Sequence, residues 1–207
     1  RYSSSAASDV YKRQMVGHNK NDPLSSKGAR NSYYKNLLKR EEAKYLIGFT
    51  DDFGIFPCDK EVRSMMNNTL KLVQNLGHEI SNTYPDMSKS EYCFQTLRAY
   101  MFYCTYKSLL KKDKSLIKEE VIWNVNKARS ITIDDLLEAE KARADIYNDT
   151  MKFFDKFDFL IVPSSVVPPF VSQNKWVKKV EDTTFDNYVS WLMIAASISL
   201  TNCPSIA

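Results

Sequence analysis

Residues that could form a reaction centre occur in only a few short groups. Ser25, Ser26 and Lys27 are adjacent, and a neutral lysine beside a serine can accept the hydroxyl proton and make the oxygen a nucleophile. Adjacent residues in a polar turn rarely converge on one reacting atom, and nothing in the surrounding sequence predicts the burial that a neutral lysine needs. We therefore interpret this group as a loop.

Neighbouring carboxylates occur twice, as Asp51 with Asp52 and as Asp134 with Asp135. Paired acid–base catalysis needs carboxyl groups that face each other, and adjacent residues do not provide this. The first pair is typical of a turn, and the second is typical of a helix N-terminus, where acids interact favourably with the helix dipole. Neither pair predicts a catalytic site.

Glycine-rich loops are missing from the sequence. Phosphate-binding and oxyanion-binding loops need several glycines because backbone N–H groups must approach the ligand closely. All five glycines here are isolated: Gly17, Gly28, Gly48, Gly54 and Gly77. The two histidines, His18 and His78, have no metal-ligand spacing to a cysteine. The residues alone therefore predict no catalytic residue, no metal site and no cofactor.

The elements that would position a site alternate between strands and helices. After a basic helix near 30–42, the apolar run YLIGF at 45–49 predicts a buried strand, and DDFGIFP predicts a turn. A helix begins at Asp59 as N-cap and ends before Gly77. Its apolar stripe consists of Val62, Met66, Leu70, Val73 and Leu76. HEIS at 78–81 then predicts a second strand, which is the order of an α/β sheet.

Two longer helical patterns follow. Residues 88–110 are helical and rich in aromatic side chains, which we interpret as core packing rather than as a ligand cage. The next helix starts at Thr132, with Asp135 at the position of a capping-box acid. Its predicted apolar face consists of Ile133, Leu136, Leu137, Ala144, Tyr147, Met151 and Phe154.

The last third of the chain returns to the sheet. FDFLIV at 157–162 predicts a strand that ends in the proline-punctuated loop PSSVVPPF. A helix is expected over 185–198, and TNCPSIA at 201–207 has the pattern of a further strand. The expected fold class is α/β, with part of a mixed β-sheet flanked by helices.

The first fourteen residues have a separate explanation. Ser4 to Gln14 match, codon for codon, one translated frame of the transposon-type adapter used in sequencing libraries. We therefore interpret residues 1–14 as an adapter-derived scar rather than a targeting peptide. Without their three basic residues and one acid, the net charge falls from +4 to +2. Such a small charge argues against nucleic-acid binding, and Lys107 to Lys114 are expected to be a solvated helix end.

Composition places the rest among ordinary soluble proteins. The chain has 207 residues, of which 43% are hydrophobic and 26% charged. Its longest apolar stretch, WLMIAASISL at 191–200, falls short of the roughly 20 residues of a membrane span. Four cysteines without a recognisable secretory signal predict reduced thiols and a cytoplasmic location. No membrane contact is expected.

Seven segments follow one another along the chain: NDPLS, YLIGFTDDFGIFPCDKEV, LGHEI, TIDDLLEAEKAR, FFDKFDFLIVPSSVVPPF, FDNYVSWL and LTNCPSIA. Their most specific motifs are PxxxxPPF, FxNYxxW and CPxI. In this order, over residues 15–207, they resemble the amidase signature family, the amidohydrolases with a Ser, cis-Ser, Lys triad. Asn187, Tyr188 and Trp191 favour the general amidase branch over the tRNA-dependent amidotransferase subunit.

The resemblance implies a partial amidase domain over 15–207. In the family the triad precedes the segment that NDPLS resembles, so no catalytic residue is assigned and the chain alone is expected to be inactive. The implied reaction cleaves a small carboxamide through an acyl-serine intermediate, without metal or cofactor, in a possible homodimer.

Loops that follow strands are the expected place for the substrate. Candidate substrate-binding residues are Ser164 and Ser165 in one loop and Thr201, Asn202 and Cys203 in another; alternatively, Pro163 and Pro204 merely shape these loops. Two other functions stay open: a non-catalytic helical interaction module, suggested by the aromatic helix at 88–110, and the amidase subunit of an amidotransferase complex.

Overall fold

The computed structural model describes residues 17–22, 25, 43–111 and 114–206. The chain divides into two units, Arg1–Ala43 and Lys44–Ala207. In the first unit, the Ser25 hydroxyl accepts a hydrogen bond from the Asn19 amide (2.9 Å) and is therefore part of a local turn. Lys27, the helix expected near 30–42 and the segment 1–14 lie outside the described residues.

The second unit contains a three-stranded parallel sheet. Its strands are β1 (Leu46–Phe49), β2 (Glu79–Ser81) and β3 (Phe159–Ile161), in the order β2-β1-β3. Ile47 of β1 is paired with Ile80 on one side and Phe159 on the other. The three predicted strands and the α/β class are thus confirmed.

Gly48 allows the sheet and a helix to approach closely. A Cβ at this position would lie 2.5 Å from the Phe153 ring and 2.5 Å from the Thr83 carbonyl oxygen. Real side chains do not tolerate such distances, because carbon atoms pack at about 3.5–4.0 Å. Glycine is therefore required here by space.

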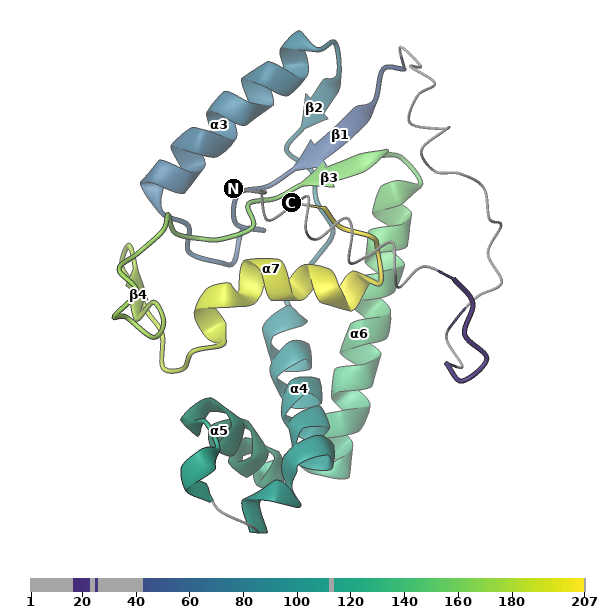
Figure 1. Cartoon of the computed structure of the whole chain (residues 1–207). Coiled ribbons are helices and arrows are strands. Elements are labelled where there is room, and N and C mark those ends of the chain that lie inside the picture. The colour runs from purple at the N-terminus through teal and green to yellow at the C-terminus, as the bar shows by residue number, and fades with distance from the viewer. Residues whose placement is uncertain (1–16, 23–24, 26–42, 112–113, 207) are drawn as a thin grey trace. The chain divides into compact units, whose positions relative to one another are not determined.

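The first crossover helix, α3 (Lys60–Asn75), lies on one side of the sheet, and α6 (Ile133–Phe154) and α7 (Met193–Ile198) lie on the other (Figure 1). The Asp59 carboxylate accepts a hydrogen bond from the Glu61 amide (2.8 Å), which confirms the predicted N-cap. Gly77 follows the helix with φ of +92°, a conformation that glycine adopts without strain. Leu76, predicted on the apolar stripe, is instead 75% exposed.

Helix α4 (Ser90–Tyr106) runs away from the sheet, and α6 (Ile133–Phe154) returns to it (Figure 1). Between them, α5 spans Glu119–Lys127, and short 3-10 turns span Leu109–Lys111, Lys114–Leu116 and Ala128–Ser130. The buried face of α4 consists of small residues, Ser90, Cys93, Thr96 and Ala99. The aromatic residues flank this face, and Tyr92 and Tyr100 are about half exposed. The prediction that the aromatics form the core was therefore wrong for these two tyrosines.

The capping box of α6 is present. The Thr132 hydroxyl accepts from the Asp135 amide, and the Asp135 carboxylate accepts from the Thr132 amide. The buried face, however, is not the predicted one. Ala139, Ala142, Ile146, Thr150 and Phe153 are buried, whereas Ile133, Leu137, Ala144 and Tyr147 are exposed. Small side chains on this face let α4 approach, as the hydrogen bond from the Cys93 thiol to the Ala139 carbonyl oxygen shows.

The C-terminal part departs most from expectation. A two-stranded antiparallel ribbon, β4 (Lys179–Val180) and β5 (Thr183–Thr184), precedes α7 (Met193–Ile198). The helix expected over 185–198 therefore begins later, after a 3-10 turn at Ser190–Leu192. A second 3-10 turn covers Ser199–Thr201, and residues 203–206 do not form the expected strand. Helix α7 packs against α4, and this second turn packs against α6. Met193, Ile194 and Leu200 contribute to the core.

Among the described residues, no helix is long and apolar enough to cross a lipid bilayer. The four cysteines are free. Burial raises the pKa of the Cys58 and Cys93 thiols to about 11, so both are poor nucleophiles at neutral pH.

Candidate functional site

The carboxyl ends of β1 and β3 meet at one edge of the sheet, where open α/β sheets bind ligands. The Thr50 amide donates to the Ile161 carbonyl oxygen (3.1 Å) and extends the pairing past the strands. The buried Thr50 hydroxyl accepts from the Phe53 amide (2.7 Å). The turn after β1 is therefore held firmly at this edge.

Arg63 of α3 neutralises the two carboxylates that follow β1. Its guanidinium donates to Asp51 (2.5 Å) and Asp52 (2.7 Å) and, through Nε, to the Cys58 carbonyl oxygen (3.3 Å). The hydrogen bond with Asp52, and then that with Asp51, raise the pKa of Arg63. Because both acids are bound to one cation, they brace the turn and cannot act as an acid–base pair. The sequence pattern did not predict this arrangement, although the basic residue eleven positions after Asp52 is a weak signal for it.

Ser164 and Ser165 lie directly beyond β3, as predicted. Ser164 is exposed, and the Ser165 hydroxyl donates to the Val167 carbonyl oxygen (2.8 Å) and accepts from the Val167 amide (3.3 Å). The loop is fixed to the start of α3 by a hydrogen bond from the Asp59 amide to the Val166 carbonyl oxygen (2.9 Å).

Thr201, Asn202 and Cys203 form a tight turn after α7, so the prediction that they lie in a loop after a strand was wrong, because a 3-10 turn continues the helix up to Thr201. The buried Thr201 hydroxyl donates to the Ile198 carbonyl oxygen (2.8 Å) and accepts from the Cys203 amide (3.2 Å). Asn202 has a left-handed backbone with φ of 57°. Within the described part of the chain, no hydrogen bond joins this turn to Ser164 or Ser165. Their shared role in substrate binding stays a prediction.

Two residues of the FDNYVSWL motif serve the packing of helices. The Asn187 side-chain oxygen accepts from the amides of Val189 (2.9 Å) and Ser190 (3.2 Å) and so starts the 3-10 turn before α7. The Tyr188 hydroxyl accepts from Arg98 of α4 (3.2 Å) and Asn124 of α5 (2.5 Å). These bonds join three segments that are distant in sequence.

A hollow on the described surface is lined by the end of the loop after β3 and the residues that follow it, and we name it the proline groove. Its volume is about 670 Å³, within the usual range for small-molecule sites. It is lined by Asp59, Val167, Pro168, Pro169, Phe170, Gln173, Asn174, Lys175, Trp176, Val177, Lys178 and Lys179. This groove was not predicted from the sequence, although aromatic and lysine residues close behind a proline-rich loop are a signal for it.

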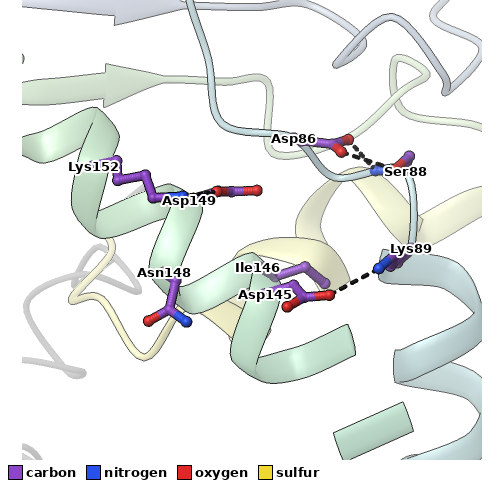
Figure 2. Close-up of a pocket in the computed structure, with 8 residues that line it drawn as sticks. All are labelled: Asp86, Ser88, Lys89, Asp145, Ile146, Asn148, Asp149 and Lys152. Atoms are coloured by element: carbon purple, nitrogen blue, oxygen red, sulfur yellow. Dashed lines mark hydrogen bonds and ion pairs between the residues drawn. The ribbon is translucent and has the colours of Figure 1, made fainter. Parts of the chain in front are cut away.

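A smaller hollow of about 180 Å³ lies between the start of α4 and the middle of α6 (Figure 2). Its charges are paired: Lys89 with Asp145 (2.8 Å), and Lys152 with Asp149 (2.9 Å). The Asp86 carboxylate accepts from the amide (2.8 Å) and the hydroxyl (3.1 Å) of Ser88. Because these groups already bind one another, this hollow joins two helices and offers little to a ligand.

The described residues thus form an α/β fold whose proline groove opens beside the loop that follows β3. The family model described as Amidase matches residues 7–207, and the chain belongs to this family, the amidase signature enzymes. The match includes residues 7–14 of the segment interpreted as adapter-derived, and that interpretation stays a prediction. A comparison with curated proteins gave no match.

Solved structures of amidase signature enzymes have the same fold. A bacterial aryl acylamidase is similar over 87% of this chain and 40% of its own, with 16% identity and a TM-score of 0.70. An inhibitor-bound vestigial protein complex, which bears on the origins of an s-triazine catabolic enzyme, is similar over 91% of this chain and 40% of its own. The identity is 17% and the TM-score 0.75. A substrate complex of 6-aminohexanoate cyclic dimer hydrolase is similar over 89% of this chain and 42% of its own, with 13% identity and a TM-score of 0.68. This chain thus spans about two fifths of the length of these proteins.

Proposed function

We propose that this chain is part of an amidohydrolase that converts a carboxamide to a carboxylate and ammonia or an amine. The observation that carries the proposal is the match to the amidase family over nearly the whole chain. In the proposed reaction a serine attacks the amide carbonyl, the amine leaves with a proton, and water releases the acyl group. Lysine and cis-serine would relay the proton, and backbone amides would hold the oxyanion.

In this proposal the described residues contribute walls of the substrate site rather than the nucleophile. Ser164 and Ser165 beyond β3, and Thr201, Asn202 and Cys203 beyond α7, would contact the acyl or leaving group. Local hydrogen bonds of Ser165 and Thr201 support this role, because they fix the loops before substrate arrives. The cytoplasmic location, the homodimer and the lack of a cofactor stay predictions.

The alternative of a non-catalytic interaction module has one observation in its favour, the half-exposed Tyr92, Tyr100 and Met101 of α4. It accounts for these side chains only, whereas amide hydrolysis also accounts for the family match. The amidotransferase alternative predicts the same fold and differs in its partners.

The test compares this chain with the protein encoded by the longer reading frame in the source DNA. Both are assayed with simple anilides and primary amides, by release of aniline or ammonia. We expect no turnover by the chain alone, and turnover by the longer protein if it carries a glycine- and serine-rich loop with an upstream lysine. Hydrolysis by the 207-residue chain would contradict the placement of the nucleophile. An intact gene without such a loop would favour the interaction module.

A second measurement tests the wall residues in the active longer protein. Ser165→Ala and Cys203→Ala should change KM ratios between amides with different acyl groups, while Ser64→Ala, at an exposed position of α3, should not. Unchanged ratios in the first two variants would remove these residues from the substrate site.

A further inference from the structure

We propose that the proline groove binds an aromatic, negatively charged part of the amide substrate, so that the preferred substrates are aromatic amides that carry a carboxylate. The inference rests on the proposed function, because it names the substrate class of that activity. It follows from the side chains that line the groove and from their charge balance.

The apolar part of the groove suits a flat ring. Pro168, Pro169, Phe170 and Trp176 line it together. Phe170 is 42% exposed, and its ring packs edge-on against Trp191, with centroids 5.8 Å apart. An exposed aromatic side chain held by a second ring presents a rigid face for stacking. A ligand ring would cover this face and remove its apolar surface from water.

The charge of the groove is positive. Three lysines line it, and the carboxylate among the lining residues is that of Asp59. Asp59 is already engaged, because its carboxylate caps α3. Lys175 is paired with the exposed Glu119 (3.2 Å). For Lys178 and Lys179, the described part of the chain provides no ion-pair partner, so both can meet a ligand carboxylate.

The segment that carries these lysines is held in place. In the β4–β5 ribbon Lys179 is paired with Thr184, and the Phe185 amide donates to the Lys178 carbonyl oxygen (2.9 Å). Val180, the next residue, is 2% exposed and fixes the ribbon to the core. A fixed backbone lowers the entropy that binding must overcome.

The smaller hollow is a useful contrast within the same molecule. Its two lysines are bound to neighbouring aspartates at 2.8 and 2.9 Å, as Figure 2 shows. A ligand carboxylate would have to displace those partners. The proline groove therefore selects for negative charge, and the smaller hollow does not.

The experiment measures binding without turnover. Ligand-observed NMR titrations of the 207-residue chain compare N-benzoylglycine with its neutral amide, N-benzoylglycinamide, which has the same ring and peptide bond. Exposed ion pairs are individually weak, so the two lysines together should favour the acid by about fivefold in Kd at low salt, which corresponds to about 1 kcal/mol. The preference should shrink as salt is raised, because exposed charges are screened.

Variants test which side chains cause the preference for the acid. Lys178→Gln combined with Lys179→Gln should abolish the preference for the acid but retain binding of the neutral amide. Trp176→Ala should weaken both ligands. The matched control, Lys71→Gln with Lys156→Gln, removes two exposed lysines elsewhere and should behave as the unmodified chain.

Equal affinity for the two ligands, or a preference that survives the loss of Lys178 and Lys179, would overturn the inference. Its failure is distinct from failure of the proposed function. A longer protein that hydrolyses only neutral amides would keep the amidase assignment and reject the substrate class. Selective binding of the acid, with no turnover by the longer protein, would keep the ligand class of the groove and reject the amidase assignment.

Discussion

Replacement of Gly48 by alanine is the sharpest test of how the sheet packs. The new methyl carbon would lie 2.5 Å from Cζ of Phe153 and 2.5 Å from the Thr83 carbonyl oxygen. Carbon atoms pack at about 3.5–4.0 Å, so the ring would have to move by about 1 Å. The ring has little room to move, because it stacks on Phe157 with centroids 4.6 Å apart and meets Phe154 edge-on at 5.0 Å.

Overpacking of this kind costs typically 1–3 kcal/mol, and the backbone oxygen of Thr83 cannot turn aside as a flexible side chain would. We expect Gly48→Ala to lower the free energy of unfolding by about 2–3 kcal/mol. With a urea m-value of about 2 kcal/mol/M, the unfolding midpoint measured by circular dichroism should fall by about 1–1.5 M.

A double-mutant cycle separates the ring from the backbone. Phe153→Leu should recover part of the loss in the Gly48→Ala background, because it removes the nearer ring atoms and leaves the Thr83 oxygen. Gly77→Ala is the matched control, since its methyl would meet open space and suffer only from the positive φ. Its loss should not respond to Phe153→Leu. A midpoint for Gly48→Ala within about 0.2 M of the unmodified chain would refute the packing of β1 against α6.

Three further predictions concern α6 and the thiols. Thr132→Ala should lower stability by about 1 kcal/mol in the same urea assay, since the helix loses its N-cap. The hydrogen bond from the Thr132 hydroxyl lowers the pKa of Asp135, so the stability that Asp135 contributes is present above the ordinary value of 3.8 and is lost as the pH falls through the lower folded value. The difference between the unmodified chain and Asp135→Asn should therefore be constant near neutral pH and shrink below about pH 4; an unchanged difference at pH 3 would contradict this. In native buffer, iodoacetamide followed by mass spectrometry should label the exposed Cys104 first and reach Cys58 and Cys93 only after urea is added, because both are buried with raised pKa values. Rapid native labelling of Cys93 would show that α4 and α6 do not pack as described.

Local signals predicted the elements whose ends are fixed by local chemistry. The Asp59 cap, the Thr132–Asp135 capping box and the strand at 45–49 follow from a few neighbouring residues. The buried face of α6 does not. Hydrophobicity favoured Ile133 and Tyr147, but close contact with α4 selected the small side chains of Ala139 and Ala142, and such a preference depends on the partner helix.

In the candidate site, too, features that depend on neighbouring residues were predicted, and features that depend on distant residues were not. The sequence predicted that Ser164 and Ser165 would follow a strand, because an apolar run ends there in prolines. The proline groove was missed, since it needs Asp59 to lie beside residues more than a hundred positions later. Arg63 was missed because its partners are identified only when α3 folds back over the turn after β1.

The pairing of β1 with β3 has a consequence for folding during synthesis on the ribosome. The Leu46 amide bonds to the carboxylate of Asp158, a separation of 112 residues. At a synthesis rate of about 5–20 residues per second, β3 is synthesised roughly 6–22 s after β1. Until then, Ile47, 5% exposed in the finished fold, can pair with β2 but not with β3. Slower translation would prolong this window and increase the opportunity for capture by chaperones or for aggregation.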